Sequence, residues 1–158
     1  LWLAGALDST IGGSTVDPQA DAVVPRRSLY FTHSRDVEEK FLSMFDNADI
    51  LRCYRRVESV VPQQALTLAN SRLGIEMARR TADRLSQRIG AEDTEGFIRA
   101  AYELILSVAP GPDEVAACLD AIHQLREQLD DTHPDPVGRA RQDLVHALFN
   151  HNDFITIR

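Results

Sequence analysis

Arginines and aromatic residues are interleaved in the first third of the chain, in a pattern that could bind an anion. Arg26, Arg27, His33, Arg35 and Arg55 occur within about thirty residues, with two tyrosines among them. Guanidinium groups make forked contacts with carboxylates, phosphates and sulfates. The pattern is a weak signature for binding an anion, a nucleic acid or a sulfated glycan. Pairing of these arginines with carboxylates from the acidic C-terminal half is the interpretation that we favour.

Side-chain amides mark the start of a helix that we expect from Pro62. Gln63 and Gln64 fall in its first turn, where backbone N–H groups lack partners within the helix. Asn70 follows seven residues after Gln63, so the two amides share a helix face. Such a face could hold an adjacent irregular segment through its backbone groups, or it could line a polar ligand site. We favour the first of these interpretations.

The histidines do not form a pattern typical of a metal site. His146 and His151 are five residues apart, which is about 140° around a helix axis, so they do not share a face. The sequence has no His-Glu-x-x-His motif. His33 is followed closely by Ser34 and Asp36, but a serine triad is recognised by geometry rather than adjacency, and no Gly-x-Ser-x-Gly occurs. We therefore predict no metal in this chain and assign no catalytic residue.

Two cysteines, Cys53 and Cys118, could form one disulfide in an oxidising compartment. The chain has no Cys-x-x-Cys and no Cys-x-x-Cys-His sequence, so it carries neither a zinc-ribbon pattern nor an attachment site for c-type haem. The segment Ile-Gly-Gly-Ser at positions 11–14 could form a small backbone nest for an anion. It lacks the P-loop motif, and a turn in a loop is the structure that we expect.

Charge is distributed unevenly along the 158 residues. The net charge is −7, but residues 26–88 carry +4 and residues 89–158 carry −8. The two regions could complement each other, and the acidic total argues against nucleic acid as a partner. No apolar run approaches the roughly 20 residues that span a bilayer, so we expect no transmembrane segment.

Helical periodicity dominates the last hundred residues. Apolar residues recur at three- and four-residue spacing over about 62–89, 94–108, 113–129 and 136–150. Gly74 is a position where the first of these helices could bend or break. The expected N-terminal caps are Ser59, Asp93 or Thr94, Asp113 and Asp135.

The remaining segments are expected to be irregular, extended or briefly helical. Residues 8–28 have the composition of a loop, and residues 36–46 could form a short helix. Residues 29–31, residues 50–61 and the last six residues are expected to be extended. The fold class is therefore mainly α: a bundle of about four helices over residues 58–158, preceded by a loop-rich segment over residues 1–57.

The first seven residues, LWLAGAL, have the apolar spacing of the last two turns of a helix. They include no initiator methionine and no basic stretch typical of a signal peptide. We therefore expect the chain to be the C-terminal part of a longer protein, with any targeting signal outside it.

Several stretches, in this order, resemble the planctomycete-specific domain one, PSD-one. They are ALDSTIGGSTVD, RRSLYFTHSR, FDNADILRCYRR, SVVPQQALTLANS, AAYELILSVAPGPDEVAACLDAI and LVHALFNHNDFITIR. The resemblance covers nearly the whole chain, as the C-terminal part of one such domain. Ser107, Val108 and Ala109 stand where many members have a Gly-Arg pair.

The resemblance implies an exported protein, in the periplasm or at the cell surface, with a cytochrome-c-like domain ahead of this one. Haem c would then lie outside this chain, and the partners would be the N-terminal domains of the same polypeptide, a polysaccharide or a redox protein. We expect a non-catalytic structural or interaction module. The alternative is a domain that binds or acts on a carbohydrate or anion. The positions that match the family motif are Cys53, Tyr54, Arg55, Pro62, Gln63, Gln64, Ala65, Leu66 and Asn70.

Overall fold

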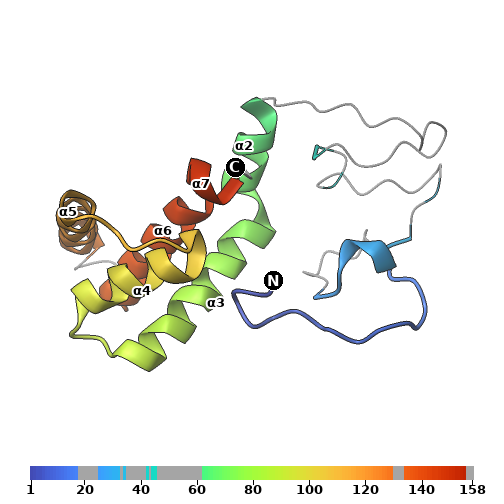
Figure 1. Cartoon of the computed structure of the whole chain (residues 1–158), viewed down its shortest axis with the longest axis horizontal. Coiled ribbons are helices and arrows are strands. Elements are labelled where there is room, and N and C mark those ends of the chain that lie inside the picture. The colour runs from blue at the N-terminus through green and yellow to red at the C-terminus, as the bar shows by residue number, and fades with distance from the viewer. Residues whose placement is uncertain are drawn as a thin grey trace.

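The computed structural model describes residues 1–17, 25–32, 34, 42, 44–45, 62–129 and 134–155. About two thirds of these residues are helical, which confirms the expected fold class. The elements are η1 (Ser28–Tyr30), α2 (Pro62–Asn70), α3 (Arg72–Ile89), α4 (Thr94–Leu106), α5 (Pro112–Leu129), α6 (Pro136–Phe149) and α7 (Asn152–Ile155). Figure 1 shows helices α2–α7 gathered on one side and the described residues 8–17 and 25–32, which include η1, on the other.

The four long helices α3–α6 form a bundle around one hydrophobic core. Helix α6 packs against α3 and α5, and α4 packs against both α3 and α5 (Figure 1). Each helix contributes the apolar stripe that its periodicity predicts. Complete burial of a side chain the size of Phe97 or Ile98 contributes roughly 1.5–3 kcal/mol. The buried apolar positions of these helices are Met77, Ala78, Ala82, Leu85, Phe97, Ile98, Ala101, Tyr102, Ile105, Val115, Ile122, Ala140, Leu144, Val145, Leu148 and Phe149.

Helices α3, α4 and α6 begin with the same local arrangement. A Ser or Asp side chain at the N-cap accepts a hydrogen bond from the backbone N–H three residues later, at 2.8–2.9 Å, and that residue is glycine each time. A Cβ at any of these glycines would collide with the capping side chain. The pairs are Ser71 with Gly74, Asp93 with Gly96, and Asp135 with Gly138.

The break in the first predicted helix lies at Ser71, before Gly74. Asn70 is the last residue of α2, and Ser71 has extended backbone angles, φ −70° and ψ 136°. The hydroxyl of Ser71 caps α3 and also donates to the carbonyl of Leu68 at 3.2 Å. Gly74 therefore lies in the first turn of a new helix, and it permits a close approach to the end of α2.

Two segments that were predicted to be extended are helical in part. Residues 28–30 form one turn of 3-10 helix, after which Phe31 makes an isolated bridge to Val16. Residues 152–155 form the short helix α7, in which the Phe154 ring stacks on Phe149 with centroids 5.2 Å apart. This contact holds the turn against α6, so the predicted strand-like alternation does not decide its structure.

The predicted cap at Asp113 is also wrong. Helix α5 begins at Pro112, so Asp113 lies within its first turn. Glu114 reaches back instead and accepts a hydrogen bond from the N–H of Gly111 at 2.7 Å. Ser59, residues 50–61 and most of residues 36–46 lie outside the described residues.

The first six residues have the hydrogen bonds that end an α-helix. The N–H of Ala6 donates to the carbonyl of Leu1 at 3.0 Å, and that of Gly5 donates to Trp2 at 2.9 Å. Gly5 has a φ of +64°. This combination is a Schellman motif. It agrees with the helix-end pattern predicted for this stretch, and it places Ala4 in the bundle core.

Candidate functional site

The side chain of Arg26 forms the centre of a folded loop. Its Nη2 donates to the carbonyls of Thr10 at 3.1 Å and Gly12 at 2.7 Å, and its Nη1 donates to Ser14 at 3.4 Å. The guanidinium lies over the Tyr30 ring, 3.9 Å from its centroid. We call residues 8–14, closed around Arg26, the arginine loop.

Other contacts close the arginine loop from both sides. Asp8 lies 3.9 Å from Nε of Arg26, and the hydroxyl of Tyr30 accepts the N–H of Gly12 at 3.0 Å. Gly12 and Gly13 have φ values of +81° and +94°, which an L side chain rarely adopts. Hydrogen bonds from Thr10, with a smaller contribution from Arg26, lower the pKa of Asp8.

Arg26 therefore uses its donors to organise its own chain. Its side chain is only 13% exposed, whereas the sequence offered an anion-binding surface as one interpretation and pairing with carboxylates of the acidic half as the favoured one. The neighbouring Arg27 is exposed and precedes η1. Three other members of the predicted basic cluster, His33, Arg35 and Arg55, lie outside the described residues.

The predicted amide face is only partly described. Gln64 is half-buried in the first turn of α2, and the side chain of Gln63 lies outside the described set. Asn70 is exposed at the end of α2, where its Nδ2 donates to the carbonyl of Leu66 at 2.9 Å. The contact that the structure describes for Asn70 therefore lies within α2, and not with an adjacent irregular segment.

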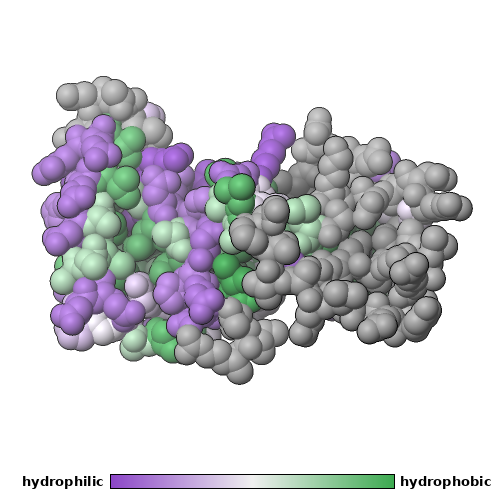
Figure 2. Space-filling view, turned by 90° about the horizontal axis from the view of Figure 1, so that it is seen from above, coloured by the Kyte–Doolittle hydropathy of each residue, from purple (hydrophilic) through white to green (hydrophobic). Residues whose placement is uncertain are grey.

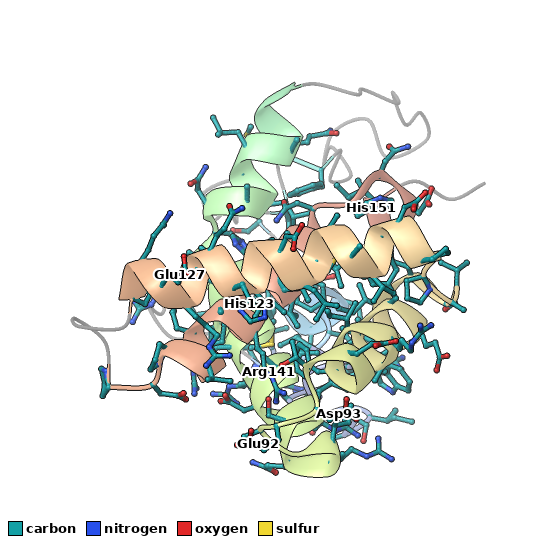
Figure 3. The ribbon with its side chains drawn as sticks, turned by 90° about the vertical axis from the view of Figure 1, so that its left-hand side faces the viewer. Glu92, Asp93, His123, Glu127, Arg141 and His151 are labelled. Carbon is teal, nitrogen blue, oxygen red and sulfur yellow. The ribbon has the colours of Figure 1, made fainter. Side chains whose placement is uncertain are left out.

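The most deeply buried charged side chain among the described residues was missed by the sequence analysis. Arg141 in α6 is 1% exposed. It donates to the carbonyls of Gly90, Ala91 and Asp93 at 3.0–3.3 Å, and to Oγ of Ser86 at 3.0 Å. A cation at the end of α3 also complements the helix dipole. Figure 3 shows Arg141 inside the bundle near the turn that carries Asp93.

The surroundings of Arg141 act on its charge in opposite directions. Burial lowers its pKa, and the nearby carboxylates of Asp93 and Asp135 partly offset this. An arginine remains charged under these conditions. The sequence did contain an indication that Arg141 is buried. Arg141 lies on the same helix stripe, at three- and four-residue spacing, as the apolar residues Val137, Leu144 and Leu148. An arginine at such a position indicates a buried charge with dedicated partners.

His123 and His151 are separate from each other. His123 lies on α5 and His151 lies between α6 and α7, well apart in Figure 3. Nδ1 of His151 accepts the N–H of Asp153 at 3.2 Å. Within the part of the chain that the structure describes, His, Cys, Asp and Glu do not form a group of three or more that could hold a metal ion.

Cys118 lies beside Tyr102 in the bundle. Its Sγ is 3.7 Å from the Tyr102 hydroxyl, and burial raises the pKa of Tyr102 to about 12. Because Cys53 lies outside the described residues, the Cys53–Cys118 disulfide stays a prediction.

Comparison with known proteins identifies the family of this chain. The family model described as PSD1, protein of unknown function (DUF1553), matches residues 1–122. The chain belongs to this family. No curated protein and no solved structure matches the chain. Within the described residues, no helix of this PSD1 chain is both long and apolar enough to cross a membrane.

The family match ends inside α5, but the folded bundle continues. Helix α6 lies beyond residue 122 and packs against α3 and α5. It also supplies Arg141, whose partners lie between Ser86 and Asp93 in the matched region. The structural unit therefore includes α6.

Proposed function

We propose that this PSD1 chain is a non-catalytic structural or interaction module, and that residues 1–158 form the C-terminal part of one domain. The observation that carries the proposal is the arginine loop. Arg26, Gly12 and Tyr30 belong to stretches that resemble the family, and their polar groups bond to one another. Asn70, another motif residue, is likewise bonded within its own helix. Motif residues whose polar groups bond within the chain in this way stabilise its conformation.

We further propose that the module follows a cytochrome-c-like domain in an exported protein of planctomycete type, located in the periplasm or at the cell surface. The family resemblance supports this setting. Its partners would be the N-terminal domains of the same polypeptide and, through them, a polysaccharide or redox protein. The haem would be attached outside this chain, which has no Cys-x-x-Cys-His sequence.

The first test is the visible absorption spectrum of the natural polypeptide that contains this chain, purified from an exporting host that matures c-type haem. The expected result is a Soret band, with α and β bands in the reduced protein. A fully matured protein without these bands would exclude the cytochrome setting. The structural role would then be judged separately, on the chain by itself.

A binding role at the predicted basic cluster is the alternative. It would involve Arg26, Arg27, His33, Arg35, Arg55, Gln63, Gln64 and Asn70, with a carbohydrate or anion as ligand. The exposed Arg27 favours it, whereas the engaged Arg26 does not.

Gln63→Ala separates the two roles. If Gln63 has a structural role, the substitution should lower the free energy of unfolding by about 1–3 kcal/mol, because a buried partner loses its hydrogen bond. If Gln63 binds a ligand, stability should change little, and binding of a sulfated or acidic glycan should be lost. Urea denaturation and a glycan-binding screen on the same protein give the two readouts.

A further inference from the structure

We draw no further inference here: the strongest candidate, the outward face of α5, on which the exposed Ala117 and Ala121 lie beside the carboxylates of Asp120 and Glu127, carries nothing, because small and acidic side chains do not identify a ligand by themselves and nothing in the structure shows what covers this face.

Discussion

The guanidinium of Arg141 lies over the Phe97 ring, 4.5 Å from its centroid, and both side chains are buried. The ring covers one face of the cation, and its Nη1 and Nη2 donate to Oγ of Ser86 and to the carbonyls of residues 90, 91 and 93. This arrangement joins α6 to the connection between α3 and α4. Among the described residues, no carboxylate forms an ion pair with Arg141, so its charge is compensated by these acceptors and the ring.

Substitution of Arg141 should destabilise the chain strongly. Arg141→Met retains much of the volume but removes the donors to Ser86 and to the carbonyls of residues 90, 91 and 93, so we expect a loss of about 1–3 kcal/mol in the free energy of unfolding. Urea denaturation followed by far-ultraviolet circular dichroism measures this loss. Arg99→Gln is the control, because Arg99 is half-exposed and pairs with Glu95 on its own helix. It should cost less than about 1 kcal/mol. Equal losses of unfolding free energy in the two variants would show that the hydrogen bonds of Arg141 stabilise the chain no more than an exposed ion pair does.

Gly74→Ala should destabilise α3, although helix propensity predicts the opposite sign. Propensity alone favours Ala over Gly by about 1 kcal/mol within a helix. A Cβ at Gly74 would lie 2.8 Å from the carbonyl oxygen of Leu68 and 2.9 Å from Oγ of Ser71. Backbone must therefore move, and we expect a lower urea midpoint. Gln87→Ala, at an exposed position of α3, is the control and should leave the midpoint unchanged or slightly raised. A raised midpoint in Gly74→Ala would mean that the close approach is easily relieved.

The helices were predictable because their signals are local. Apolar spacing of three and four residues identified α4 and α6. Asp135 was expected to begin α6, and Asp93 was one of two residues, with Thr94, that were expected to cap α4. The sequence analysis placed the helix break at Gly74, whereas it lies at Ser71. Gly74, which permits the close approach of α2 and α3, is more conspicuous in the sequence than Ser71, which caps α3. An apolar pattern that contains alanine or glycine does not indicate which residue ends a helix.

The polar contacts were not predictable, because they join distant residues. Arg26 meets carbonyls 12–16 residues away, and Arg141 meets partners 48–55 residues away. The sequence indicated that arginines would need acceptors, and the expected acceptors were carboxylates of the acidic half. The structure supplies backbone carbonyls to Arg26 and Arg141, while Arg79 and Arg80 pair with Glu76 on their own helix.

The Glu76 cluster should give the chain a component of acid sensitivity. Hydrogen bonds from Arg79 and Arg80 lower the pKa of Glu76 from 4.5 to about 2. Because the pKa in the folded chain is below the unfolded value, this stabilisation is present above about pH 4.5. It is lost as the pH falls toward 2. Both arginines are about half-exposed, so solvent screening limits the contribution to about 1 kcal/mol.

Glu76→Gln provides the measurement of this effect. The difference in unfolding free energy between wild type and variant should shrink as the pH is lowered from 5 to 2. Arg80→Gln removes one of the two donors and should show an intermediate pH dependence. A wild-type–variant difference that stays constant over this range would show that the cluster does not respond to pH.

The adjacent arginines at positions 26 and 27 offer the sharpest test of the arginine loop. Arg26→Ala removes the donors to Thr10, Gly12 and Ser14, so amide hydrogen exchange over residues 8–16 should accelerate by about tenfold or more. The bundle should retain its helical circular dichroism, because its core does not depend on these carbonyls. Arg27→Ala removes the same charge from an exposed neighbour and should leave exchange in this segment unchanged. Equal acceleration in both variants would mean that net charge, rather than the contacts of Arg26, maintains the loop.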